Sequence, residues 1–250
     1  MIEGFREFEF NLPDALLASL IEAFEDMESA SLLREHVVQL PEAQGVYQLL
    51  YEDNIVYVGK TDGEAGLRQR LGRHAFSIQH RRNLDESLVK FRALRVFVFT
   101  AVDLEAQLIK HYGGKSKVTW NNSGFGSNDP GRERDTTKIK VGGFDDLFPI
   151  DLDRPIELVG LKDPIIAADV LAALRREVPY IIRAQTLKKR PHPDLLVAAG
   201  RGQGLTTARE VIRSILEGLP PGWQATMLPG RIILYHEQRE YSAGVVIARS

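Results

Sequence analysis

Two tyrosines in the segment GVYQLLYEDNIVYVGK, residues 45–60, are the first candidates for chemistry. A tyrosine hydroxyl can exchange a proton, but its ordinary pKa near ~10 makes it a weak base unless a cation such as Lys60 stabilises the phenolate. Two apolar runs about a polar turn predict a β-hairpin. A three-residue loop centred on Glu52 would pair Tyr47 directly with Tyr57, whereas a loop one residue different would put them on opposite faces. Cross-strand aromatic pairs are also common as packing alone.

The next candidates are Arg70 and His74 in GLRQRLGRHAFSIQH, residues 66–80, which has the apolar spacing of a helix. Because they are four residues apart, they share one helical face. An arginine can hold a phosphate with paired donors, and a histidine can transfer a proton near neutral pH. A solvated surface pair would explain the same spacing.

A carboxylate and an amide follow farther along the chain. Glu105 lies near the start of a predicted helix over residues 103–112. There it can favour the helix dipole, or act as the single protein ligand of Mg²⁺, which takes one or two carboxylates and keeps several waters. The segment TWNN, residues 119–122, offers Asn121 or Asn122 as an uncharged contact for a phosphate.

In order and spacing, these features resemble the GIY-YIG nuclease superfamily. Gly-Val-Tyr, Tyr-Val-Gly, Arg-x-x-x-His, a helical Glu and an Asn follow one another between residues 45 and 121, with Val46 and Val58 in place of the isoleucines that name the family. The stretches GLRQRLGRH, LEAQLI, WN and GFGSNDPGRERD resemble its restriction-endonuclease branch over residues 10–149. We recognise no relative for the chain beyond residue 187.

The resemblance implies an endonuclease that uses Mg²⁺, or Mn²⁺, to hydrolyse phosphodiester bonds of double-stranded DNA and leaves 5′-phosphate ends. It implies a role for each candidate: Tyr47 or Tyr57 as general base with Lys60 beside it, Arg70 at the scissile phosphate, His74 in proton transfer, Glu105 as metal ligand and Asn121 at the phosphate.

Sequence reading must come from outside this core, because phosphate contacts position a protein and base contacts specify the sequence. The predicted DNA contacts are Arg68 and Arg73 on the helix and Asn128, Arg132, Arg134 and Lys138 in the polar loop of residues 124–140. The same loop composition is also typical of an unstructured segment.

The predicted partners follow from the leading hypothesis, a type II restriction endonuclease. One active site cuts one strand, so a palindromic site calls for a homodimer or a tetramer, with a companion DNA methyltransferase. A repair, homing or other defence nuclease acting on branched or single-stranded DNA is the alternative. A DNA-binding protein that has lost the chemistry is a third reading.

The elements that must position these residues predict an α+β protein, with a small antiparallel sheet and flanking helices followed by a small C-terminal α/β module. Asn11 is a plausible cap for a helix over residues 14–28. Further helices are predicted at 163–183, where Pro179 ends or bends the helix, and at 206–218, with strands at 93–100 and in GVVIAR, and a hairpin across 228–231. The proline-rich LKKRPHPD predicts a boundary, which divides the chain into a nuclease domain, 1–186, and an accessory module, 187–250.

Composition limits the possible classes of protein. The 250 residues are 44% hydrophobic and 26% charged, as in ordinary globular proteins. A net charge of −2 argues against wholesale coating of nucleic acid, yet six basic and two acidic residues between 60 and 82, and the basic segment 187–193, suit a polyanion bound at one face. There is no cysteine, apolar membrane span or signal peptide, so we expect a cytoplasmic protein without a membrane partner.

Overall fold

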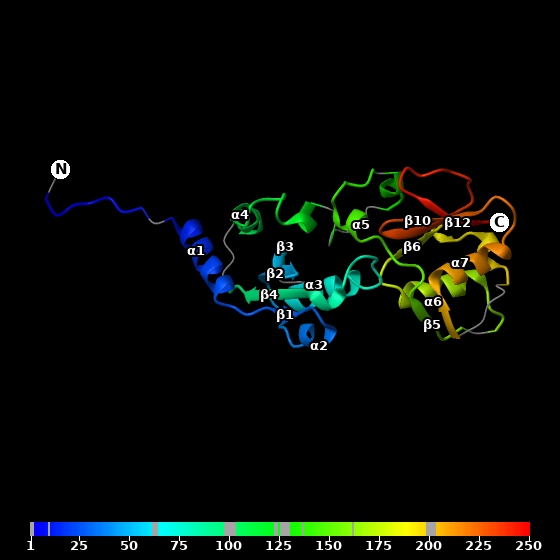
Figure 1. Ribbon diagram of the computed structural model, residues 1–250, viewed down its shortest axis with the longest axis horizontal. Helices are drawn as coiled ribbons and strands as arrows, with labels where there is room; N and C mark the ends of the chain where they lie inside the picture. Colours follow the sequence, from blue (N-terminus) through cyan, green and yellow to red (C-terminus); the bar gives the residue numbers. More distant parts are fainter. Residues whose placement is uncertain are drawn as a thin grey trace. The chain divides into compact units, whose positions relative to one another are not determined.

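The computed structural model describes residues 3–9, 11–61, 65–97, 104–122, 125, 131–136, 138–161, 163–198 and 204–250. The chain forms two compact units, residues 1–75 with 85–122 and residues 76–84 with 123–250, each built around its own sheet (Figure 1). The predicted α+β class is therefore confirmed. Within the described ranges, no helix has the length and apolar character needed to cross a bilayer.

The first unit contains a four-stranded antiparallel sheet in the order β1-β4-β2-β3. Its strands are β1 (Ala30–Ser31), β2 (Gly45–Tyr51), β3 (Asn54–Thr61) and β4 (Val89–Arg95). Its helices are α1 (Leu12–Glu25), α2 (Arg34–Val37), α3 (Gly66–Ser77) and α4 (Leu104–His111), with single turns η1 (Glu86–Leu88) and η2 (Thr119–Asn122). The predicted cap of α1 is confirmed, since the Asn11 side chain accepts a hydrogen bond from the Asp14 amide.

The β2–β3 hairpin turns through two residues rather than the three that would pair Tyr47 directly with Tyr57. Glu52 and Asp53 have φ values of 50° and 61°, the conformation of a type I′ turn, which matches the twist of the strands. A two-residue turn alone would put the tyrosines on opposite faces, but Val56 is an extra, bulged residue of β3 that reverses the alternation. Tyr57 consequently pairs with Leu49, on the same face of the sheet as Tyr47.

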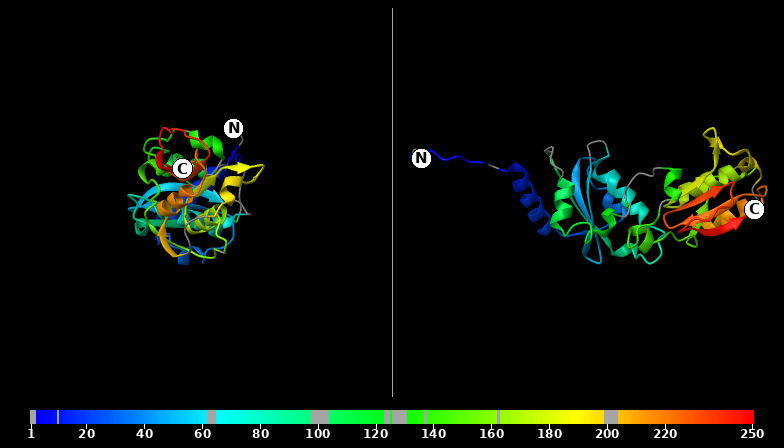
Figure 2. Two further views of the ribbon diagram at one scale, coloured as in Figure 1. Left: turned by 90° about the vertical axis from the view of Figure 1, so that its right-hand side faces the viewer. Right: turned by 90° about the horizontal axis from the view of Figure 1, so that it is seen from above.

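Helices cover both faces of this sheet (Figure 2, right). α1 and α4 pack on the face that carries Val46 and Val58, through buried Phe24 and Leu104 among others. α3 covers the opposite face, which carries the tyrosines. The predicted strand at 93–100 begins earlier, as β4, because Val89–Arg95 pairs with β2 along its whole length; residues 98–100 lie outside the described ranges.

The second unit contains a mixed sheet in the order β12-β10-β11-β6 with α6 and α7 packed against its core. Its helices are α5 (Phe144–Leu147), α6 (Ala167–Glu177) and α7 (Ala208–Glu217), with single turns η3 (Arg132–Thr136) and η4 (Pro193–Leu196). Its strands are β5 (Pro155–Leu158), β6 (Ile181–Ala184), β7 (Thr186–Leu187), β8 (Arg190–Pro191), β9 (Gly204–Thr207), β10 (Gln224–Leu228), β11 (Arg231–Tyr235) and β12 (Val245–Arg249). The hairpin across 228–231 and the last strand are as predicted.

The helix predicted from residue 163 ends at Glu177, just before Pro179, as expected, and Ile181–Ala184 beyond it forms a strand parallel to β11, where branched side chains pack well. One expectation for this unit differs from the structure. The boundary predicted at residue 187 falls inside the second unit, whose core extends from Ile150 to Ile247. LKKR is not a linker there but the turn of the β7–β8 hairpin.

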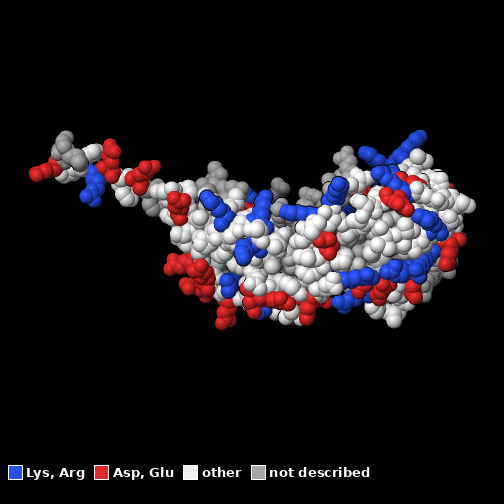
Figure 3. Space-filling model, turned by 45° about the horizontal axis from the view of Figure 1, so that its top comes forward, with Lys and Arg blue, Asp and Glu red and all other residues white. Residues whose placement is uncertain are grey.

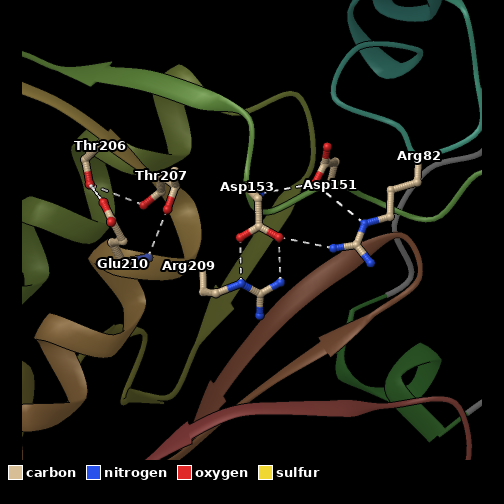
Figure 4. A network of polar contacts seen from close by, with 7 residues as sticks. All are labelled: Arg82, Asp151, Asp153, Thr206, Thr207, Arg209 and Glu210. Carbon is tan, nitrogen blue, oxygen red and sulfur yellow. Dashed lines mark hydrogen bonds and ion pairs between the residues drawn. The ribbon is translucent and has the colours of Figure 1, made fainter.

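The residues that follow α3 are anchored in the second unit by two neighbouring arginines. Buried Arg81 donates through Nη1 to the Asp145 carboxylate at 2.8 Å and to the Phe148 carbonyl at 3.0 Å. Arg82 shares Asp153 with Arg209, whose guanidinium donates to both carboxylate oxygens at 2.6 and 3.0 Å (Figure 4). The end of α3 is thus held by one buried and one exposed ion pair.

The two arginines form a matched test of that anchor. Arg81→Met should lower the free energy of unfolding of the second unit by about 3 kcal/mol, because it removes one partner of a buried ion pair and leaves Asp145 uncompensated. Arg82→Met should cost under about 1 kcal/mol, since that pair is exposed. The measurement is urea denaturation followed by Trp223 fluorescence in a Trp120→Phe background. Equal losses would contradict the assigned difference in burial.

Candidate active site

The hydroxyl of Tyr47 lies at the centre of a group of side chains from β2, β3 and α3. It is 2.8 Å from Nε2 of His74, and it accepts a hydrogen bond from Nε of Arg70 at 3.3 Å. The Tyr57 ring stacks on Tyr47 with centroids 5.9 Å apart and lies 5.1 Å from the His74 ring. The structure therefore brings together four residues that the sequence singled out.

Gly59 makes this arrangement sterically possible. It pairs with Tyr47 across the hairpin, and a Cβ built on it would lie 2.4 Å from the Tyr47 hydroxyl and 2.8 Å from Cε1 of Tyr57. Real side chains do not tolerate such contacts, so only glycine lets both rings lie over β3. Sequence reasoning missed this role, although the glycine of the Tyr-Val-Gly motif was its visible signal.

Burial and charge set the protonation states of the group. Burial raises the pKa of Tyr47 well above its usual value, and Tyr57 raises it further, while the Arg70 charge acts in the opposite direction. Burial, followed by the charges of Arg70 and Arg73, lowers the pKa of His74 to about 3. Burial alone would lower the pKa of Arg70, but its interactions with Tyr47 and Tyr57 together raise it more. At neutral pH, a cation therefore faces a neutral phenol and a neutral imidazole.

This charge state gives the hydroxyl a defined hydrogen-bonding role. Because Arg70 can only donate, the Tyr47 oxygen accepts from it, and the Tyr47 proton is available for Nε2 of His74. Tyr47 and His74 are buried, with 0% and 1% of their surface exposed, whereas Arg70 is only half-buried. A ligand arriving from solvent would meet the guanidinium first.

Lys60 does not have the place that we expected for it. It is exposed and pairs with Val46, so strand alternation puts it on the face opposite to the tyrosines. The cation that contacts the Tyr47 hydroxyl is Arg70 instead. Strand alternation in the sequence indicates the same for Lys60, because it is three residues from Tyr57 and an odd spacing puts two side chains on opposite faces.

Asn121 acts on the backbone of β3. Its side-chain oxygen accepts a hydrogen bond from the Val58 amide at 2.7 Å, and its side-chain nitrogen donates to the Val58 carbonyl at 2.6 Å. This pair of contacts fixes the strand that carries Tyr57 and Gly59. We therefore assign Asn121 a positioning role rather than the phosphate contact expected from the sequence; the side chain of Asn122 lies outside the description.

Glu105 lies in the first turn of α4, which packs beside β3 on the Val46 and Val58 face. β3 is last in the order of the sheet, so a side chain from α4 can approach the tyrosines only around that edge. Among the described residues, no group of three or more His, Asp or Glu side chains could hold a metal ion. Glu105 offers a single carboxylate, which suits Mg²⁺ with bound waters rather than a cage of protein ligands.

The predicted DNA contacts fall into three groups. Arg73 on α3 and Lys138 are exposed, and Arg73 donates to the side-chain oxygen of Gln69 at 3.2 Å. Arg68 and Arg132 already have partners, since Arg68 donates to the Leu40 carbonyl at 2.7 Å and Arg132 to the Glu237 carboxylate at 2.8 Å. Asn128 and the side chain of Arg134 lie outside the described part of the chain.

Comparison with known proteins adds no relative. No protein-family model matches the chain. No curated protein matches it either. The assignment of a function therefore rests on the residues and their geometry.

The low pKa of His74 has a measurable consequence. The pKa of His74 is about 3 in the folded chain and about 6.5 in the unfolded chain. The contribution of neutral His74 to the free energy of unfolding is therefore complete above pH ~6.5. That stability is lost as the pH falls from ~6.5 towards ~3, by up to ~1.4 kcal/mol per pH unit, because only the unfolded chain takes up the proton.

His74→Gln should remove this part of the slope, and His111→Gln, at an exposed histidine of α4, should keep it. The measurements are urea denaturation at several pH values, followed by Trp120 fluorescence, and an NMR titration. A His74 resonance that titrates between about pH 5 and 8 would contradict the assignment.

Proposed function

We propose that this protein is a metal-dependent endonuclease that hydrolyses phosphodiester bonds of double-stranded DNA, as the resemblance to the GIY-YIG restriction endonucleases implies. The observation that carries the proposal is the contact of one buried tyrosine hydroxyl with both a neutral histidine and an arginine. The polar groups of Tyr47 and His74 are costly to bury, and a site for phosphoryl chemistry gives them and the half-buried Arg70 a use.

In the proposed reaction, Arg70 receives the scissile phosphate, because it is the member of the group that solvent reaches. Its guanidinium holds the phosphate oxygens and offsets the charge that develops during attack. The Tyr47 oxygen takes a proton from the attacking water as the Tyr47 proton passes to Nε2 of His74. The resulting hydroxide attacks phosphorus, and the bond to the 3′ oxygen breaks.

Binding of a phosphate also prepares His74 to accept that proton. Burial is the main cause of the low pKa of His74, and the charges of Arg70 and Arg73 lower it further. A phosphate anion on the arginines would offset those charges and raise the pKa of His74. Tyr57, stacked on Tyr47, would hold the phosphate or the water in place.

Glu105 is the residue we assign to Mg²⁺ or Mn²⁺. A bound divalent ion would stabilise the charge on the leaving oxygen. The position of α4 beside the edge strand suits this assignment, since β3 itself carries Tyr57 and Gly59.

Cleavage of both strands at a palindromic site would require two copies of the chain related by a two-fold axis, as a homodimer or a tetramer. A restriction enzyme of this kind would work in the cytoplasm beside a methyltransferase that protects the host DNA.

The first test is digestion of a sequenced plasmid with Mg²⁺, with the ends mapped afterwards. The wild-type chain should cut the plasmid at each copy of one short sequence. Tyr47→Phe should cut at least about 10²-fold more slowly, because the path of the proton from the attacking water to His74 is lost. Tyr51→Phe, at another tyrosine of β2, is the matched control and should cut normally. Cuts only in branched or single-stranded DNA would favour a repair nuclease, and the absence of any metal-dependent cutting would refute the proposal.

The second test separates binding from catalysis. Glu105→Gln should abolish cleavage with Mg²⁺, because it removes the carboxylate assigned to the metal, while binding of the same duplex persists. Binding should even strengthen slightly without metal, since a carboxylate near phosphates is repulsive. Asp103, the neighbouring carboxylate in the sequence, lies outside the described residues. Gel-shift titration beside the cleavage assay measures both properties, and near wild-type cutting by Glu105→Gln would show that the metal assignment is wrong.

A further inference from the structure

The β7–β8 hairpin of the second unit carries an unusual turn. Leu187 pairs with Arg190, so the two turn residues are Lys188 and Lys189, with φ values of 50° and 65°. Such a turn favours Asn-Gly, because other residues rarely adopt positive φ. Two consecutive lysines are thus held in a conformation that their side chains make unfavourable.

The strained turn presents a concentrated positive charge. Lys188, Lys189 and Arg190 are all exposed, and the segment QTLKKRPHP around them contains no carboxylate. The hairpin, yellow in Figure 2, projects beyond the helices and the sheet of its own unit. Figure 3 shows lysine and arginine side chains standing out from the surface of this unit at the upper right. Strained backbone at an exposed, charged tip indicates a contact surface more readily than a packing element.

A pocket of about 240 Å³ opens beside the base of the hairpin. Ala168, Leu171 and Leu195 supply apolar lining, and Thr186, Lys189 and Arg175 supply polar groups. Nε of Arg175 donates to the Ile182 carbonyl at 2.9 Å. Burial lowers the pKa of Arg175, and among the described residues no carboxylate opposes that shift. An arginine and a lysine therefore line one pocket, and no acidic side chain is among the described residues that line it.

We propose that the β7–β8 hairpin and this pocket form a second DNA-contacting site, in which Lys188, Lys189 and Arg190 bind backbone phosphates and Arg175 holds one phosphate at the pocket. This inference rests on the proposed function, and it gives the C-terminal unit a part in it. The ligand is the duplex backbone outside the cut sequence.

The chemistry of the surface favours the duplex backbone over other anions. Lysines are point charges that match phosphate without reading bases, so they increase affinity at any sequence. Three adjacent cations match a regular row of phosphates better than a single small anion. The apolar lining beside Arg175 suits the deoxyribose that adjoins a bound phosphate, and Leu187 at the tip, 52% exposed, offers apolar contact in a groove.

The test uses the full chain and a turn substitution that preserves the hairpin. Lys188→Asn with Lys189→Gly removes two charges and installs the residues that a type I′ turn prefers, so the thermal stability should stay equal or rise. Fluorescence anisotropy with a labelled duplex, without divalent metal and over a series of salt concentrations, measures binding. We expect the dissociation constant to rise by about threefold to thirtyfold. The slope of log affinity against log salt should decrease by about two, one for each lost phosphate contact.

Matched variants locate the effect. Arg154→Gln with Arg213→Gln removes two exposed arginines of the same unit and should change neither affinity nor slope. Arg175→Gln should reduce the slope by about one. Unchanged binding by the turn variant, with normal binding by the wild-type chain, would overturn this inference and leave the nuclease proposal intact. Failure of the wild-type chain to bind any duplex would instead count against the nuclease proposal.

A small phosphate compound is the other possible occupant of the pocket. Protection of the wild-type chain against heat by inorganic phosphate, lost in Arg175→Gln while duplex binding stays unchanged, would assign the pocket to such a compound. That result would overturn the inference.

Discussion

The register of the β2–β3 hairpin decides whether the first unit has a site at all. The two-residue turn alone would put Tyr47 and Tyr57 on opposite faces of the sheet. The extra residue Val56 shifts the register by one residue, so the two tyrosines share a face. The same register puts Gly59 under the Tyr47 ring, where any Cβ would collide. Removing either feature would turn one tyrosine away or push both rings off the strand. Backbone pairing, rather than side-chain attraction, therefore assembles the group.

A second consequence of this geometry is electrostatic. Behind Arg70, the hydroxyl of Tyr47 and the imidazole of His74 are shielded from water, so both remain neutral and contact each other directly. In such a low-dielectric position, the arrival or loss of one nearby charge alters proton affinity more than it would in water. The partly exposed arginine thus links events at the surface to the buried pair. Asn121 contributes from a distance, by fixing the strand on which this geometry depends.

The sequence predicted the class of fold and most helices, because apolar periodicity and capping are local properties, as at Asn11. It predicted the meeting of Tyr47, Tyr57, Arg70 and His74 correctly, although through a hairpin loop of the wrong length. The sequence alone did not predict contacts that depend on the pairing of distant segments. The bulge at Val56 has no signature in a single sequence, whereas the face of Lys60, three residues after Tyr57, follows from strand alternation alone. Ile181–Ala184 reads as the end of a helix until β11 is present to pair with it.

The second unit is tied to segments that the sequence assigned to the nuclease. η3, which follows the polar stretch GFGSNDPG, is held on the second sheet by the buried Asp135 carboxylate, which accepts hydrogen bonds from Tyr235, at 2.7 Å, and from Arg183. Arg132 of the same turn lies 4.3 Å from the centre of the Tyr235 ring. A buried carboxylate satisfied by two donors is costly to disrupt, so this segment is fixed to the second sheet. Residues 131–136 therefore belong to the second unit, although the sequence placed them in the first predicted domain.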